Sequence, residues 1–102
     1  GYMELHGSND AQLFDTGRLV ATPGVLEVTK RNGQGIEPLL KRHLSGDWGD
    51  MHDEDKEAND AAVNGEIKQR VMSSYDLPDG NKVWIITEWD RSVTTLLLPS
   101  EY

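Results

Sequence analysis

Two spacings of apolar residues organise this chain. Between residues 25 and 62, apolar side chains recur three or four positions apart, which is the spacing of one face of a helix. From residue 70 to residue 99 they fall into short runs rich in β-branched and aromatic residues, which is typical of strands. The C-terminal third is therefore predicted to be the sheet against which the upstream elements pack.

Three short helices are predicted from their caps and terminators. Thr22 and Pro23 suit the cap and the first position of a helix, because the N–H that proline lacks would have no partner there. A second helix is predicted over residues 37–44, and a third opens at Asp53, where the helix dipole favours carboxylates. The three helices end at Asn32-Gly33, Ser45-Gly46 and Asn64-Gly65.

An antiparallel meander of three strands is predicted after residue 70. Asp79-Gly80 is a strong hairpin signal, and Asp90-Arg91 is a weaker one. If the chain turns on these two pairs, Tyr75 lies opposite Trp84, and Trp84 lies opposite Leu97. Side-chain alternation then places Val71, Tyr75, Trp84, Ile86, Val93 and Leu97 on one face, and Met72, Val83, Ile85, Leu96 and Leu98 on the other.

The pattern as a whole predicts an α+β fold with a short N-terminal strand near residues 17–22, three short helices and the C-terminal meander. We expect residues 1–13 to be a disordered or cloning-derived segment, and residues 14–102 to form one domain, since 102 residues suffice for a single core. Nothing in the sequence resembles a signal peptide or a membrane helix, so a cytoplasmic protein is expected.

Charge is concentrated in one stretch of the chain. Residues 47–60 hold seven acidic residues and one lysine, a net −6 of the formal −8 of the whole protein. This balance argues against a nucleic-acid partner, because phosphate binding relies on Lys and Arg. The chain has no cysteine, which excludes disulfides, thiolate zinc sites and cysteine nucleophiles.

Both faces of the predicted meander are apolar, whereas an antiparallel sheet with one solvent-exposed face would have polar side chains on that face. Three short helices are expected to cover only one face. The second face is left to the N-terminal segment or to another copy of the chain. An exposed apolar face of this kind is predicted to be an interaction surface for a protein partner or for a second copy of the chain, which would form a homodimer.

The densest group of reactive side chains lies in residues 43–53. His43, Asp47, Asp50 and His52 could supply nitrogen and oxygen ligands to a divalent metal. Their spacing matches no compact motif, and an EF-hand is excluded because glycine and glutamate are not where its loop needs them. No metal or other cofactor is assigned from the sequence, and these four residues stay candidates only.

Several residues near this stretch have a structural and a functional interpretation. His43 falls inside an apolar helical stripe, so it is either a buried, hydrogen-bonded histidine or a pH-sensitive or catalytic one. Trp48, between two glycines, is either a core anchor or a recognition aromatic. The acidic and basic side chains around Asp90 form either an acid–base pair or a surface ion pair at a turn. The candidate interaction residues are Trp48, Trp84, Ile86, Trp89 and Arg91.

Three segments resemble a family of small uncharacterised bacterial proteins encoded on plasmids, integrative elements and similar mobile DNA. They are His43-Leu-Ser-Gly-Asp-Trp-Gly49, Ala58-Asn-Asp-Ala-Ala62 and Trp84-Ile-Ile-Thr-Glu-Trp-Asp-Arg-Ser-Val-Thr-Thr-Leu-Leu-Leu-Pro-Ser-Glu-Tyr102. The likeness runs from about Phe14 to Tyr102. It implies no activity and no catalytic residue. Members more often carry alanine where this chain has Trp89, which implies an extra aromatic at the hairpin tip.

The leading functional hypothesis is a non-enzymatic accessory protein of a mobile element that binds another protein or itself. It rests on the two-sided apolar strands, the local acidity and the lack of a nucleophile or phosphate-loop motif. One alternative is a metal-dependent enzyme or binder that uses His43, Asp47, Asp50 and His52. Another is an acidic DNA mimic whose carboxylates, in residues 47–60, compete for a basic surface.

Overall fold

The computed structural model describes residues 12–102. Its elements, in chain order, are β1 (Arg18–Ala21), α2 (Pro23–Arg31), α3 (Glu37–Leu44), α4 (Asp53–Val63), β2 (Val71–Asp76), β3 (Lys82–Thr87), β4 (Val93–Leu97) and the 3₁₀ turn η1 (Pro99–Glu101). This confirms the α+β class. Of the expected N-terminal segment, residues 1–11 lie outside the described residues, and Leu13 already contacts the fold, because its N–H donates to the Leu44 carbonyl at 2.8 Å.

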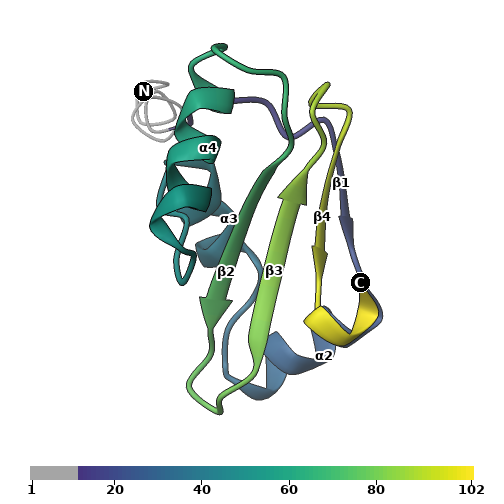
Figure 1. Ribbon diagram of the computed structural model, residues 1–102. Helices are drawn as coiled ribbons and strands as arrows, with labels where there is room; N and C mark the ends of the chain where they lie inside the picture. The colour runs from purple at the N-terminus through teal and green to yellow at the C-terminus, as the bar shows by residue number, and fades with distance from the viewer. Residues whose placement is uncertain (1–11) are drawn as a thin grey trace, which may run out of the picture.

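The four strands form one mixed sheet in the order β1-β4-β3-β2 (Figure 1). The three C-terminal strands are antiparallel neighbours, as the turn signals predict. The short N-terminal strand adds to the far side of β4 and runs parallel to it, with Leu19 beside Thr94. The predicted N-terminal strand is therefore confirmed, while its parallel pairing, which makes the sheet mixed, was not predicted.

The helices begin and end where the sequence predicts. The Thr22 hydroxyl accepts a hydrogen bond from the Val25 N–H at 3.2 Å, and Pro23 occupies the first turn of α2. Asn32 and Asn64 are the C-terminal caps of α2 and α4, each followed by a glycine with positive φ. These short helices are delimited by local chemistry, which is why the sequence was sufficient to place them.

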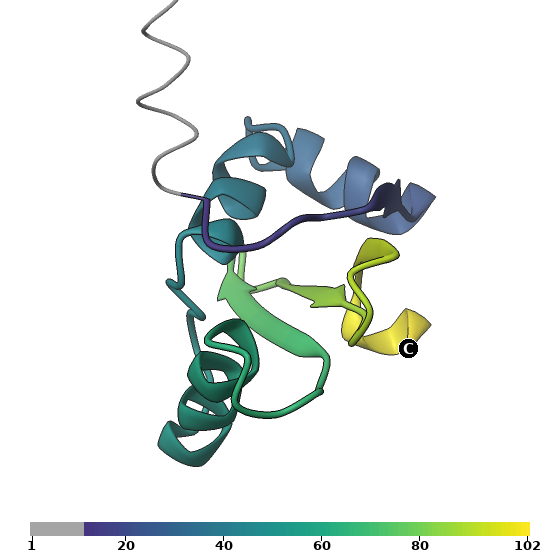
Figure 2. The same cartoon turned by 90° about the horizontal axis from the view of Figure 1, so that it is seen from above.

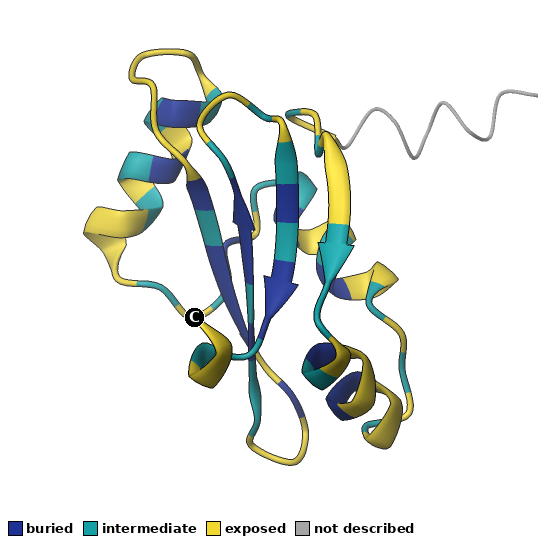
Figure 3. Ribbon diagram, turned by 90° about the vertical axis from the view of Figure 1, so that its right-hand side faces the viewer, coloured by how far each residue is buried: buried dark blue, intermediate teal, exposed yellow. Residues whose placement is uncertain are grey.

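Seen from above, α2 and α3 lie on one side of the sheet, while α4 and the C-terminal turn lie toward the other (Figure 2). We call the side under α2 and α3 the helical face and the opposite side the second face. Burial is greatest in β2, β3 and β4, while β1 and the outer sides of the helices are exposed or half-buried (Figure 3). The main core lies under the helical face and contains Val25, Val28, Leu39, Tyr75, Leu77, Val83, Ile85 and Leu96.

The predicted register between β2 and β3 is wrong by one residue. Tyr75 pairs with Val83, and Ser74 pairs with Trp84, whereas the predicted pairing of Trp84 with Leu97 is confirmed. A slip of one residue moves every side chain of a strand to the opposite face. Val71 and Tyr75 therefore join the helical face, and Met72 joins Trp84 on the second face.

The cause of the shift is the hairpin turn between β2 and β3. The Gly80 N–H donates to the Leu77 carbonyl at 2.9 Å, and the Leu77 N–H donates to the Asn81 carbonyl at 2.8 Å. Pro78 thus takes the second position of a β-turn, and Gly80 follows with φ of 92°. This loop holds one residue more than a turn closed on Asp79-Gly80 alone, and the extra residue shifts the register.

The second face is more fully covered than the sequence predicted. Ile86 and Leu97 are only 5% and 7% exposed. The turn η1 contacts β3, and the Tyr102 ring meets Trp84 edge-on, with 5.6 Å between the ring centroids. Residues 99–102 therefore cover part of the face that the sequence analysis left to the N-terminal segment or to another copy of the chain.

The outer edge of β2 is closed by residues outside the sheet. The Asn59 side chain of α4 donates to the Met72 carbonyl at 2.7 Å and accepts from the Met72 N–H at 3.2 Å. Further along, the Ser74 N–H donates to the Trp48 carbonyl, and the Asp50 N–H donates to the Ser74 carbonyl. An edge whose backbone groups are satisfied in this way offers no template to another chain.

We expect Asn59→Ala to lower the free energy of unfolding by about 2 kcal/mol, because it leaves the Met72 N–H and carbonyl without partners. Urea denaturation checks this value, and light scattering checks whether the opened edge makes the protein aggregate. The control is Glu57→Ala on the exposed side of α4, which should change stability by less than about 0.5 kcal/mol. Equal effects of the two variants would contradict this role of Asn59.

Gly49 allows the loop before α4 to run against β2. It has φ of 75°, and a Cβ at this position would collide with the Ser74 carbonyl and the Tyr75 ring. Gly80 has a similar φ of 92° but open space where its Cβ would be. Of the two glycines, only Gly49 therefore combines a left-handed backbone with crowding.

Gly49→Ala should destabilise the protein by about 3 kcal/mol or more, because backbone strain and overpacking add. Gly80→Ala should cost only about 1 kcal/mol, since it introduces the strain alone. Thermal and urea unfolding of the two variants measure the difference. If Gly80→Ala were as damaging as Gly49→Ala, the close approach of the loop to β2 would not be the cause.

Candidate functional site

His43, near the C-terminal end of α3, is the most deeply buried titratable side chain that the sequence singled out. Its Nδ1 lies 2.5 Å from the Ser73 hydroxyl of β2, and its Nε2 lies 3.0 Å from the Thr87 hydroxyl of β3. Thr87 is in turn 2.7 Å from Thr94 of β4, whose hydroxyl donates to the Thr16 carbonyl at 2.8 Å. One chain of hydrogen bonds thus joins α3, three strands and the segment before β1.

The last bond in this chain fixes the direction of the others. A carbonyl oxygen only accepts, so the single Thr94 proton is committed to Thr16. Thr87 must then donate to Thr94 and accept from the Nε2–H of His43. The remaining nitrogen, Nδ1, carries no proton and accepts from Ser73. Each hydroxyl and imidazole proton in this hydrogen-bond chain therefore has a single acceptor. His43 is a neutral imidazole with its proton on Nε2.

Burial, together with the nearby positive charge of Arg91, lowers the pKa of His43 to about 3. The hydrogen-bond chain has the same consequence. A doubly protonated ring would present a second N–H to Ser73, which would have to stop donating. His43 is therefore held neutral through the physiological pH range.

The contact between Ser73 and His43 resembles the pairing of a nucleophile with a base, but its setting is different. Both side chains are 0% exposed, so a substrate cannot reach the hydroxyl in this conformation. The Ser73 hydroxyl also donates its proton to Nδ1 of His43, in a contact between β2 and α3 inside the core. Of the two interpretations offered by the sequence, the geometry fits the buried, hydrogen-bonded histidine.

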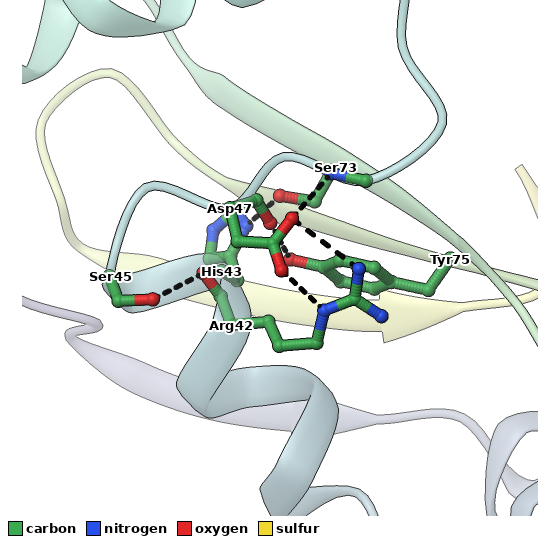
Figure 4. Close-up of polar contacts among 7 residues, drawn as sticks. Arg42, His43, Ser45, Asp47, Ser73 and Tyr75 are labelled. Atoms are coloured by element: carbon green, nitrogen blue, oxygen red, sulfur yellow. Dashed lines mark hydrogen bonds and ion pairs between the residues drawn. The ribbon is translucent and has the colours of Figure 1, made fainter.

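The turn after α3 is held by a second group of polar contacts (Figure 4). Arg42 donates to the Asp47 carboxylate at 2.6 Å, and its guanidinium lies over the Tyr75 ring, 4.4 Å from the centroid. The Tyr75 hydroxyl donates to the Asp47 carbonyl at 2.6 Å. The hydrogen bond from Arg42 lowers the pKa of Asp47, and burial raises the pKa of Tyr75 to about 12.

Trp48 is a core anchor, which was the first of its two predicted roles. Its indole N–H donates to Asp60 of α4 at 2.9 Å, and its ring meets His43 edge-on and stacks on Phe14. The guanidinium of Arg91 lies 5.5 Å from the centroid of the Phe14 ring. Trp48 is buried, so it presents almost no surface to a partner.

Arg91 forms no ion pair at the hairpin tip. Its guanidinium donates to the backbone carbonyls of Gln69, Glu88 and Ala62, at 3.1, 3.0 and 3.2 Å. It therefore joins the β3–β4 hairpin to the end of α4 and to the segment before β2. Both sequence interpretations of this tip, an acid–base pair and a surface ion pair, are replaced by a cation that binds backbone carbonyls.

The four metal-ligand candidates are not brought together. His43 is sealed in the core, Asp47 is paired with Arg42, and Asp50 accepts from Lys82 at 2.9 Å. His52 is exposed at the start of α4. Within residues 12–102, no group of three or more His, Asp or Glu side chains is arranged to hold a metal ion.

A groove of about 450 Å³ lies on the second face, between α4 and the sheet. Its apolar part comes from Met51, Met72 and Trp84. Polar side chains surround this part, namely Asp50, His52, Asp55, Asn59, Gln69, Arg70, Ser74 and Lys82. The volume is that of a site for a small ligand or for one or two side chains of a partner.

The groove is bounded by charges that are partly paired. Lys82 donates to Asp76 at 2.7 Å as well as to Asp50, and these two contacts raise its pKa. Arg70 donates to the Tyr102 hydroxyl at 2.8 Å. An arginine bonded through one nitrogen keeps other N–H groups available, so Arg70 is the cation best able to receive a partner at this rim.

The remaining interaction candidates divide between core and surface. Ile86 is buried within β3, and Trp89 is 57% exposed at the β3–β4 hairpin. In the acidic stretch, Asp47, Asp50 and Asp60 bind Arg42, Lys82 and Trp48. The stretch is therefore partly structural, and its exposed carboxylates belong mainly to the first turns of α4.

The sequence did not identify Ser73, Thr87, Thr94 or Asn59 as important, although a signal for three of them exists. In the observed register, the two threonines pair with each other, and Ser73 points to the same face. Three inward hydroxyls on adjacent strands of an apolar face indicate a buried polar partner. The predicted register separated Ser73 from the threonines, which concealed the pattern.

No protein-family model, no curated protein and no solved structure matches this chain. Across residues 12–102, none of the helices combines the length and the apolar character needed to cross a membrane.

The buried histidine predicts a pH dependence of stability. The folded-state pKa of His43 is about 3, below its ordinary value of 6.5, so the unfolded chain binds the proton more readily. The stabilisation is complete above 6.5 and is lost as the pH falls from there toward 3. In this window we expect the burial of neutral His43 to lower the free energy of unfolding by about 1.4 kcal/mol for each unit by which the pH falls.

Comparison with His43→Gln isolates this contribution, since glutamine can both accept and donate but does not titrate. Urea unfolding at a series of pH values should give a steeper acid loss for the wild type than for the variant. The carboxylates contribute equally to both proteins. Parallel pH profiles would show that His43 is not held neutral.

Proposed function

We propose that the protein is a non-enzymatic binding protein that receives a protein partner in the groove on the second face. The observation that carries the proposal is the chemistry of this groove. Trp84 and Met72 supply apolar surface at its base, and Arg70 stands at its rim. Tryptophan and arginine are the residues most often found where binding energy is concentrated.

The rest of the surface favours this location. The opposite side of the sheet is covered by α2 and α3, and the β2 edge is closed by Asn59 and the Trp48–Asp50 segment. Trp84 stays half-buried although its strand neighbours are buried. A side chain from a partner that covered Trp84 would remove this apolar surface from water.

The partner class is another protein, and a second copy of the chain is the simplest member of that class. We also propose that the protein serves a plasmid or similar mobile element. This proposal rests on the resemblance of the segments around His43, Ala58 and Trp84 to proteins encoded on such DNA. The cytoplasm would be its location.

We expect Trp84→Ala to lose partner binding, because it removes the apolar base of the groove. The comparison is affinity purification from the native host with wild type, Trp84→Ala and Trp89→Ala, followed by identification of the proteins retained. Trp89 is an exposed tryptophan outside the groove, so its variant is the matched control. The Trp84→Ala variant should bind one partner about tenfold more weakly, which corresponds to a loss of about 1.4 kcal/mol of binding free energy.

Arg70→Ala provides a second variant at an exposed position, where loss of folding is not expected. Self-association is checked by light scattering over a range of concentrations, with the same three variants. A partner or dimer retained equally by wild type, Trp84→Ala and Arg70→Ala would overturn the assignment to the groove. A monomer with no selective partner would overturn the proposed function itself.

A further inference from the structure

Two Asn-Gly pairs occupy equivalent positions in this fold. Asn32 caps α2 with φ of −90° and ψ of 11°, and Asn64 caps α4 with φ of −77° and ψ of −2°. The glycine that follows each has positive φ and open space around the position of a Cβ. The two sites therefore share sequence, backbone conformation and glycine environment.

Their side chains differ. The Asn32 amide nitrogen donates to the Val28 carbonyl at 2.8 Å, and its amide oxygen accepts from the Asp79 N–H at 3.1 Å. Asn32 is thereby tied both to its own helix and to the β2–β3 turn. The Asn64 side chain is exposed and makes no hydrogen bond to any residue between 12 and 102. Of the two side chains, only that of Asn32 is therefore restrained by hydrogen bonds within residues 12–102.

The backbone N–H groups of the two glycines also differ slightly in the length of their hydrogen bonds. The Gly33 N–H donates to the Lys30 carbonyl at 3.0 Å, while the Gly65 N–H donates to the Ala62 carbonyl at 3.3 Å. The Ala62 carbonyl is shared with Arg91, which donates to it at 3.2 Å. The amide nitrogen at Gly65 is therefore held by the longer of the two bonds.

We propose that Asn64 is a site of spontaneous deamidation and that the fold protects Asn32 from the same reaction. The Gly65 backbone nitrogen attacks the side-chain carbonyl carbon of Asn64, loses its proton to water and forms a succinimide ring. The side-chain amide leaves as ammonia. Water then opens the ring at one carbonyl or the other and leaves aspartate or isoaspartate.

Glycine at the next position matters because the attack requires the backbone to rotate. Without a Cβ, Gly65 adopts a wide range of conformations, and the space around it is open. Asn32 must first break two side-chain hydrogen bonds, which makes its reaction about tenfold slower or more. The contrast arises from the fold, because the dipeptides are identical.

Deamidation at Asn64 would destabilise the C-terminal end of α4. A carboxylate at residue 64 lies at the C-terminal end of the helix, where the dipole disfavours negative charge. Isoaspartate would also reroute the backbone through the former side chain and disturb the cap at Gly65. Both products would loosen the last turn of α4, including the Ala62 carbonyl that Arg91 binds.

Incubation of the intact protein at mildly alkaline pH, followed by tryptic digestion and mass spectrometry, tests the proposal. Residues 57–68 and residues 32–41 form separate tryptic peptides, so the two sites are read independently. We expect the 57–68 peptide to gain the deamidated mass about tenfold faster. Fragmentation places the change at Asn64 and not at Asn59, whose amide is buried and doubly bonded.

The same incubation in denaturant is the decisive control. Unfolding removes the hydrogen bonds of Asn32, so the two rates should converge. Equal rates in the folded protein, or a faster reaction at Asn32, would overturn the proposal. A rate difference that persisted in denaturant would overturn its structural cause, and the variant Asn64→Ser should abolish the mass change in the 57–68 peptide of the folded protein.

Discussion

The rest of this structure depends on the burial of one neutral imidazole, that of His43. His43 needs a donor on one side and an acceptor on the other, and these come from Ser73 and Thr87 on adjacent strands. A slip of β2 by one residue would turn Ser73 away and leave a buried nitrogen unpaired, at a cost of about 1–3 kcal/mol. The apolar residues of β2 do not discriminate between registers as strongly, because both faces of the sheet contain apolar side chains. A buried polar group thus specifies a pairing that hydrophobicity alone leaves open.

The two faces of the sheet serve different purposes. The helical face is closed by α2 and α3 and by the hydrogen-bond chain that starts at His43. The second face is closed only in part, by α4 on one side and by the C-terminal turn on the other, and the groove lies there with Trp84 at its base. The acidic stretch links the two regions, because Asp60 holds Trp48 and Asp50 holds Lys82. Its charge is therefore partly a means of attaching α4 and the preceding loop to the sheet.

The features that depend on neighbouring residues could be predicted from the sequence. The cap at Thr22, the Asn-Gly terminators and the strand runs all follow from local chemistry, and the structure has them where expected. The register of β2 required knowing that Pro78 and Gly80 build a longer loop, and an error of one residue there hid the convergence of Ser73 with Thr87. The role of Asn59 depends on the position of α4 beside an edge strand, which no local pattern encodes. The parallel attachment of β1 is likewise set by contacts across most of the chain.

The pairing of β1 with β4 has a consequence for how the protein forms. Arg18 lies beside Val93, so the first of the four described strands to be synthesised pairs with the last of them. Helices α2 and α3 can form as they emerge, but their apolar sides have no completed sheet to cover until β4 is available. Non-local pairing of this kind slows folding, because a long loop must close before any contact compensates for it. The apolar sides of α2 and α3 therefore stay exposed in the nascent chain until β4 has been synthesised.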